Sequence, residues 1–217
     1  MLGVLKILAQ GGLVMAPLAV CSILALTVIL ERYVALRGAD RGGAELIAFI
    51  RLALQRGGGL EALKKCERAH GPVANVLAAG LRAYLLGSPV RQAMEEQALA
   101  EQPALHRRLA VLDTTVTLAP LLGLLGTVLG MISAFRIISV SGTSHPAGIT
   151  GGVAEALVAT ATGLAIAIFS LVGYNWCRDK LRRITEEIEL RATQLENLVS
   201  VGAARAVPER EEIPVAS

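Results

Sequence analysis

Three long stretches of this chain contain no charged residue, and polar segments separate them. The stretches run from Gly12 to Leu30, from Thr114 to Phe135 and from Ala156 to Cys177, and none contains Asp, Glu, Lys or Arg. About 20 apolar residues are enough for an α-helix to cross the hydrocarbon core of a bilayer. The pattern therefore predicts three transmembrane helices, at 12–31, 113–136 and 152–177.

The polar segment between the first two stretches, 32–112, has the periodicity of a helical domain. Apolar residues recur at three- and four-residue spacing, and glycines around 57–59 and the pair Ser88-Pro89 separate short helices. Ser88 and Pro89 fit the N-cap and first position of a helix, which Pro103 would kink if it ran into the second span. A similar stripe follows the third span and predicts a helix over 178–202; it consists of Leu181, Ile184, Ile188, Ala192 and Leu195.

The remaining segments are short. We expect an amphipathic interfacial segment at 1–11, a periplasmic loop at 137–151 and a disordered tail at 203–217. The first apolar stretch is expected to be a retained helix, because Glu31 and Arg32 follow it where a secretory signal would have a small-residue cleavage site. The predicted fold class is thus an all-α, multi-pass membrane protein with a cytoplasmic helical domain.

The distribution of basic residues sets the expected orientation. Of the 21 Lys and Arg residues, 12 lie between Arg32 and Arg108 and 7 lie between Arg178 and Arg210. Basic residues are retained on the cytoplasmic side of membrane proteins. The first loop and the C-terminus are therefore predicted to be cytoplasmic, with the N-terminus and the loop 137–151 outside.

Composition supports close helix packing and narrows the classes of function. Hydrophobic residues make up 53% of the chain, aromatic residues only 3%, and 22 residues are glycine, as in helices that approach closely in lipid. A formal net charge of only +3 does not indicate a nucleic-acid-binding protein. The scattered cysteines and histidines indicate neither a metal site nor a cofactor, and no nucleophile with a base lies at matching depth, so no enzyme is predicted.

One carboxylate, that of Glu155, lies at the start of the third apolar stretch. An ionisable group inside a span is costly and marks an ion pathway or a buried partner. Arg136 lies about one turn nearer the outer surface, so an ion pair between the two side chains is the structural alternative. Such a pair would not exclude a role for Glu155 in proton entry.

The last two predicted spans contain two threonines, which make one face of each helix polar, and several glycines, which form rows of small residues. Thr127 and Thr160 each lie eight residues from the outer end of their span, so we expect their hydroxyls at similar depth, about 12 Å in. The structural alternative is that each bonds its own helix backbone. Gly123, Gly126, Gly130 and Gly163 are predicted to pack helices closely, and packing is favoured over a pore for these rows.

The last two apolar stretches resemble those of a known protein family. The stretch TLAPLLGLLGTVLGMISAF, followed after a short loop by GGVAEALVATATGLAIAIFSLVGYN, closely resembles the ExbB, TolQ and MotA proton-channel family, and the resemblance covers about 12–200. Three spans and a loop of this size resemble the ExbB/TolQ branch, and ExbB within it. Carried over by motif, the family's functional positions are Thr127 of GTVLG, Glu155 of AEAL and Thr160 of VATA.

The resemblance implies a proton-channel motor subunit of the bacterial inner membrane. It implies a homopentamer around a pair of ExbD-like single-span helices that carry the titrating aspartate, and use of the proton motive force to energise TonB for outer-membrane transport. Alternatives remain open at this stage. They are a TolQ-like subunit working with TolR-like and TolA-like proteins in envelope maintenance, and a non-conducting scaffold whose polar face only holds a partner helix.

Overall fold

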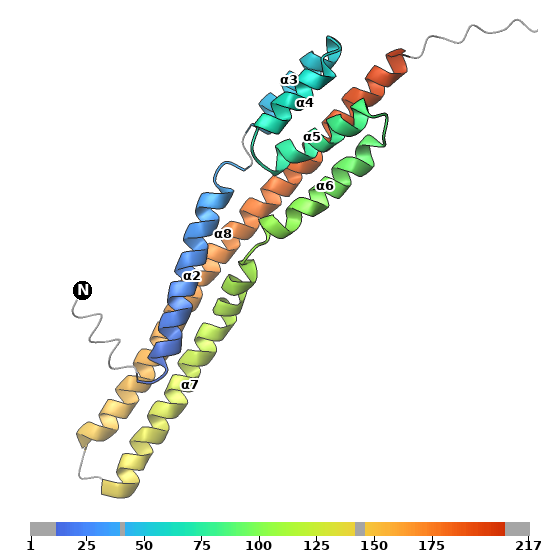
Figure 1. Cartoon of the computed structure of the whole chain (residues 1–217). Coiled ribbons are helices and arrows are strands. Elements are labelled where there is room, and N and C mark those ends of the chain that lie inside the picture. Colours follow the sequence, from blue (N-terminus) through green and yellow to red (C-terminus); the bar gives the residue numbers. More distant parts are fainter. Residues whose placement is uncertain (1–11, 40–41, 142–145, 207–217) are drawn as a thin grey trace, which may run out of the picture. The chain divides into compact units, whose positions relative to one another are not determined.

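The computed structural model describes residues 12–39, 42–141 and 146–206, and within these residues all regular structure is helical (Figure 1). The helices are α2 (Met15–Leu36), α3 (Gly43–Gln55), α4 (Gly59–Arg68), α5 (Pro72–Leu85), α6 (Val90–Leu105), α7 (Leu109–Ser141) and α8 (Pro146–Ala206). The segment 1–11 and residues 207–217 of the expected tail lie outside the described residues.

The chain divides into two compact units. The first holds α2, α7 and the part of α8 up to Asp179; the second holds α3 to α6 and the part of α8 from Lys180 onward. Three helices of the described chain are long and apolar enough to cross a membrane, and they are α2, α7 and α8. The all-helical fold is confirmed within the described residues, and the three long apolar helices are consistent with the predicted membrane class.

Within the first unit, α8 separates small and large side chains onto opposite faces. Ala156, Ala159 and Ala167 are buried, whereas Leu164 and Phe169 are exposed, Phe169 to 75%. A bulky apolar face left open suits hydrocarbon, while a small face lets another helix approach. The small face of α8 is therefore used for packing inside this chain, as the row of small residues predicts.

Within the second unit, α8 supplies the stripe that the sequence predicts. Leu181, Ile184, Ile188 and Leu195 are all buried there. At Gly80 of α5 an added Cβ would meet Met94 of α6 at 2.7 Å and Leu195 of α8 at 2.9 Å. The three helices thus meet at a point where only glycine fits without a shift.

Several helix boundaries differ from those that the sequence suggests. α7 continues to Ser141 and α8 begins at Pro146, so both ends of the expected loop 137–151 are helical, and α8 extends to Ala206, inside the expected tail 203–217. Pro89 is the N-cap of α6 and Val90 its first residue, so the helix begins one position later than the expected Ser88 cap, and no side chain caps it. Pro103 lies inside α6, which ends at Leu105. The break before α7 comes at 106–108, where Arg108 has a positive φ of 61°.

Candidate functional site

The α7–α8 interface of the first unit brings the two backbones into contact. A Cβ added at Gly126 would lie 2.4 Å from the Cβ of Ala159, and one added at Gly163 would lie 2.5 Å from the carbonyl oxygen of Ala119. A Cβ at Gly130 would lie 2.7 Å from the carbonyl oxygen of Gly152. Because real side chains do not come this close, glycine is required at these crossings.

Thr160 connects the two helices through its hydroxyl. Its Oγ1 donates to the carbonyl oxygen of Gly123 on α7 at 3.0 Å and lies 3.3 Å from the carbonyl oxygen of Ala156 on its own helix. A Cβ at Gly123 would lie 3.1 Å from the Cα of Thr160, so glycine there is what lets the hydroxyl reach the α7 backbone. The hydroxyl hydrogen is engaged by backbone, and the oxygen keeps acceptor capacity.

Thr127 is one helical turn away from this contact. Its Oγ1 donates to the carbonyl oxygen of Leu124 at 2.6 Å, within α7. The residue of α7 opposite Thr160 is Gly123, four positions earlier, so the two hydroxyls differ in depth by about 6 Å at 1.5 Å per residue. The register of the hairpin therefore moves Thr127 one turn from the level expected for it.

The carboxylate of Glu155 lies against the start of α2. A Cβ added at Gly12 would lie only 1.6 Å from its Oε1, and the side chain as a whole is half-buried. Arg136, by contrast, is exposed, and the structure records no ion pair between Arg136 and Glu155. The start of α2, rather than Arg136, is thus the neighbour of the candidate carboxylate.

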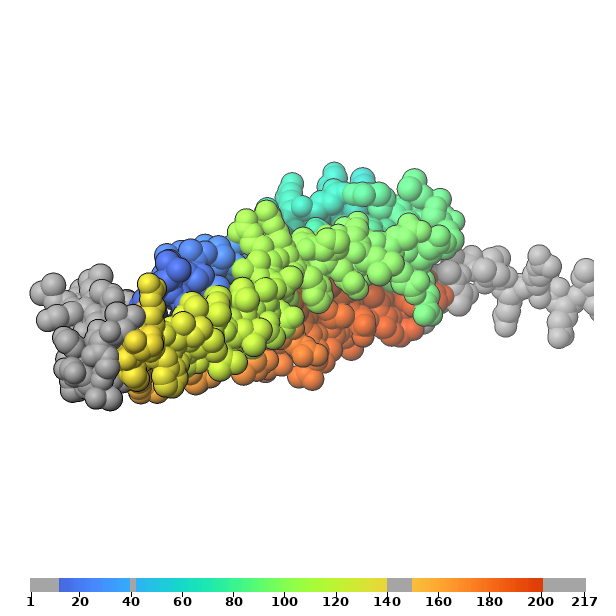
Figure 2. Space-filling view, turned by 90° about the horizontal axis from the view of Figure 1, so that it is seen from below, coloured from blue at the N-terminus to red at the C-terminus, as the bar shows by residue number. Residues whose placement is uncertain are grey.

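α7 lies against α2 as well as α8, as Figure 2 shows with α7 in yellow to yellow-green, α2 in blue and α8 in orange. Val14, just before α2, and Met15 and Leu18 in its first turns belong to a core that also contains Ala119 and Ala167. The Cβ of Val14 would be 3.8 Å from a Cβ added at Gly126. These apolar contacts hold the first turn of α2 in register beside Glu155.

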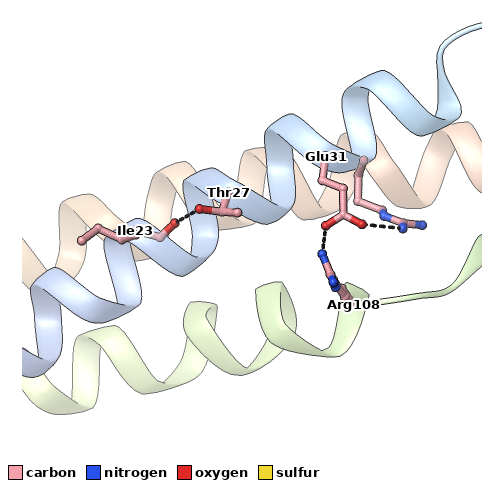
Figure 3. A network of polar contacts seen from close by, with 5 residues as sticks. Ile23, Thr27, Glu31 and Arg108 are labelled. Atoms are coloured by element: carbon pink, nitrogen blue, oxygen red, sulfur yellow. Dashed lines mark hydrogen bonds and ion pairs between the residues drawn. The ribbon is translucent and has the colours of Figure 1, made fainter.

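The other end of α2 is joined to α7 by charge (Figure 3). Glu31 accepts hydrogen bonds from Arg108, just before α7, and from its neighbour Arg32 at 3.3 Å. Further along, the rings of Tyr33 on α2 and Trp176 on α8 lie 5.3 Å apart. Aromatic and charged groups of this kind are typical of the ends of membrane spans.

An apolar groove of about 840 Å³ runs between α2 and α8. Leu26, Ile29, Phe169 and Trp176 are among its lining residues, and Ser170 also lines it. The Ser170 hydroxyl is fully buried and makes no hydrogen bond within the described chain. At Gly173 an added Cβ would be 2.5 Å from Ile29, so the floor of the groove is tightly packed.

The candidate residues on α8 are spread along the helix. Glu155 and Thr160 are five positions apart, about 7.5 Å along its axis. In the part of the chain that the structure describes, no group of three or more His, Cys, Asp or Glu residues can hold a metal ion.

The sequence predicts Thr127, Glu155 and Thr160 as site residues, and it does not point to Gly12, Glu31 or Arg108 as their neighbours in the first unit. The sequence around a glycine that precedes an apolar stretch does not show which distant side chain will contact it. From the sequence, Glu31 only marks the end of the first span, and Arg108 is only one of the basic residues of the first loop. Their pairing depends on α2 and α7 being adjacent, and that adjacency is not encoded by spacing along the chain.

Comparison with known proteins places these residues in a family. The model of the MotA/TolQ/ExbB proton channel family matches residues 68–190, which include Thr127, Glu155 and Thr160. An ExbB-like biopolymer transport protein of Synechocystis sp. is 35% identical over 86% of this chain and 90% of its own length. An ExbB homologue of Methanothermobacter thermautotrophicus is 31% identical over 86% of this chain and 67% of its own length.

A third relative covers slightly more of this chain. The biopolymer transport protein ExbB of Pseudomonas putida is 30% identical over 90% of this chain and 63% of its own length. The close-packed α7–α8 hairpin, the Thr160 bridge and these matches agree with the resemblance that the sequence motifs carry. The chain therefore belongs to the MotA/TolQ/ExbB proton channel family.

Proposed function

We propose that this chain is the proton-channel subunit of an inner-membrane motor. In this proposal it works with an ExbD-like single-span protein and uses the proton motive force to energise a TonB-like protein that serves outer-membrane transport. The single observation that carries the proposal is the Thr160 hydroxyl, which lies at the α7–α8 contact on the same helix as Glu155 and within the family match. The names of the relatives favour the ExbB form over the TolQ form.

The need for a second protein follows from the distribution of charge. Glu155 lies near one end of its span, and no Asp, Glu, Lys or Arg follows it until Arg178. A proton cannot cross some 30 Å of hydrocarbon with one carboxylate at the end of the path. A complete path therefore requires an ionisable group from another chain, which an ExbD-like helix with an aspartate would supply.

The proposal includes an orientation and an assembly. The basic residues of 32–108 and 178–210 favour a cytoplasmic side for both segments, with the starts of α2 and α8 outside. A ring of copies, five by the family resemblance, would surround the partner helices. Thr127 and Thr160 would line the path, Glu155 would mark its outer entry, and Gly123, Gly126, Gly130 and Gly163 would hold α7 against α8.

The test is proton flux in liposomes that contain this chain with its ExbD-like partner. Thr160→Val removes the hydroxyl at nearly constant volume, Thr160→Ser keeps it, and Thr162→Val is the matched control. Thr162 is half-buried on the same helix, but its hydroxyl bonds only the Val158 carbonyl of its own helix, at 2.8 Å. Native mass measurements follow assembly in every sample.

We expect flux to fall in Thr160→Val and to remain in Thr160→Ser and Thr162→Val, with the complex intact in all three. Unchanged flux in an intact Thr160→Val complex would remove Thr160 from the proton path. Loss of assembly with Glu155→Gln and Thr160→Val alike would favour the scaffold reading, because a scaffold has only binding to lose.

A further inference from the structure

Gly12 has two properties that together point to a specific role. Its φ of +69° lies in the left-handed region, which side chains disfavour. The place that its Cβ would take is filled by the Glu155 carboxylate, with Oε1 at 1.6 Å and Cδ at 2.7 Å. The backbone conformation therefore favours glycine here, and any other residue would have to displace the Glu155 carboxylate.

The backbone at this position is fixed to the helix that it precedes. The amide N–H of Met15 donates to the Gly12 carbonyl at 3.1 Å and closes the turn that opens α2. Val14 and Met15, two and three positions later, are buried in the core shared with α7 and α8. Packing at the start of α2 therefore fixes the position of the Gly12 backbone beside the Glu155 carboxylate.

Glu155 itself makes no hydrogen bond or ion pair that would fix its carboxylate from another side among the described residues. A glutamate has three rotatable bonds, and ordering them requires a contact. The backbone of Gly12 is one such contact. A methyl group there has to displace the carboxylate or push α2 away.

We propose that Gly12 is a positioning residue for Glu155, and that the first turn of α2 sets where this carboxylate is presented at the outer end of the spans. The inference rests on the proposed function, in which Glu155 marks the proton entry. It extends that function by making α2 part of the entry, whereas the family motifs lie only in α7 and α8.

The experiment compares Gly12→Ala with Gly57→Ala, which is matched in backbone strain. Gly57 has a φ of +72°, and a Cβ added there meets nothing within 4 Å. Both variants thus carry the left-handed strain, but only Gly12→Ala collides with a side chain. The readout is the rate at which a carbodiimide modifies Glu155, measured by mass on the peptide that contains it, in the chain assembled with its partner.

We expect Gly12→Ala to change the modification rate of Glu155 severalfold and Gly57→Ala to leave it at the wild-type value. Adding Glu155→Asp to Gly12→Ala shortens the side chain by one methylene and is expected to restore part of the proton flux that Gly12→Ala loses. An unchanged modification rate in a folded, assembled Gly12→Ala complex would overturn the inference.

The two readouts separate this inference from the proposed function. A changed modification rate with unchanged flux would support the positioning role of Gly12 and remove Glu155 from the proton path. If Gly12→Ala fails to assemble, Gly12→Ser and the pair Gly12→Ala with Glu155→Ala are measured by native mass. Recovery of assembly in the pair would support the collision, and failure of the pair to assemble while Gly12→Ser behaves like wild type would overturn it.

Discussion

The Thr160 hydroxyl donates to the Gly123 carbonyl across the α7–α8 contact, at 3.0 Å. This bond exists because residue 123 has no side chain, which lets the Thr160 backbone approach to the position where a Cβ would be 3.1 Å away. Threonine and glycine thus act as a pair, and a change at either one alters both helix packing and the environment of the hydroxyl.

The first prediction compares the two threonines in stability. Thr160→Val loses an interhelical hydrogen bond, which in membrane proteins is worth about 0.6 kcal/mol. Thr127→Val loses only a bond to Leu124 of its own helix. We expect thermal unfolding in detergent to shift to lower temperature for Thr160→Val and to stay unchanged for Thr127→Val.

A shift of equal size in both variants would contradict the difference in hydrogen bonding. If the expected result holds, Thr127→Val becomes the cleaner probe of the proton path. Any loss of flux in that variant would then come from the hydroxyl and not from a loosened hairpin.

The second prediction concerns the glycines of the helix contact. Gly163→Ala puts a Cβ 2.5 Å from a backbone oxygen, and overpacking of this kind costs about 1–3 kcal/mol. Gly151→Ala, near the start of the same helix, meets nothing within 4 Å. We expect Gly163→Ala to lower thermal stability and assembly, and Gly151→Ala to match the wild type, with both followed by unfolding and native mass.

The third prediction separates charge from backbone strain at Arg108. This residue has a φ of 61°, and left-handed geometry costs a side-chain-bearing residue about 1–2 kcal/mol. Its ion pair with Glu31 joins two partly exposed side chains, and such pairs contribute about 0–1 kcal/mol. Arg108→Gly and Arg108→Ala both remove the pair, but only glycine removes the strain.

We therefore expect Arg108→Gly to unfold at a higher temperature than Arg108→Ala, by an amount equivalent to about 1 kcal/mol. Glu31→Gln, which weakens the pair and leaves the backbone alone, is the control and is expected to cost less than Arg108→Ala. Equal stability of the Gly and Ala variants would show that the positive φ is not strained.

The fourth prediction uses Cys66, which is buried in α4 at 1% exposure. Burial, with a smaller effect of the Glu67 carboxylate, raises the pKa of its thiol to about 11 from an ordinary value of 9.0. Between pH 9 and 11 the folded chain keeps this proton while the unfolded chain releases it. The stability that this group contributes is present below pH 9 and is lost as the pH rises toward 11.

Two measurements check the prediction for Cys66. Alkylation of Cys66 by iodoacetamide, read on its peptide by mass, should be slow at pH 8 in the folded chain and fast in denaturant. The stability of Cys66→Ala should fall less steeply than that of the wild type between pH 9 and 11. Rapid alkylation of the folded chain at pH 8 would contradict the shifted pKa.

The apolar stretches and the small-residue faces could be predicted from the sequence, because both follow from local periodicity. The face of α8 with Ala156 and Ala159 is buried and the face with Leu164 is exposed, as the helical wheel requires. The stripe that includes Ile184 and Ile188 is buried for the same reason. Helical spacing is a property of each segment alone, so no knowledge of its neighbours is needed.

Relationships between helices could not be predicted in the same way. Equal distances from the span ends suggest that Thr127 lies beside Thr160, but the packing of small residues selects Gly123 instead. The contact between Gly12 and Glu155 and the pair of Glu31 with Arg108 depend on where α2 lies. Such contacts arise from tertiary packing, which overrides estimates made from single segments.

The seam where α7 meets α8 has a consequence for the route of the proposed proton path. Even a methyl carbon does not fit at Gly126 or Gly163, so a water molecule, which needs more room, does not enter there. A continuous line of water molecules therefore cannot run between α7 and α8 past these two glycines. The proposed proton path must therefore run beside this seam and not through it.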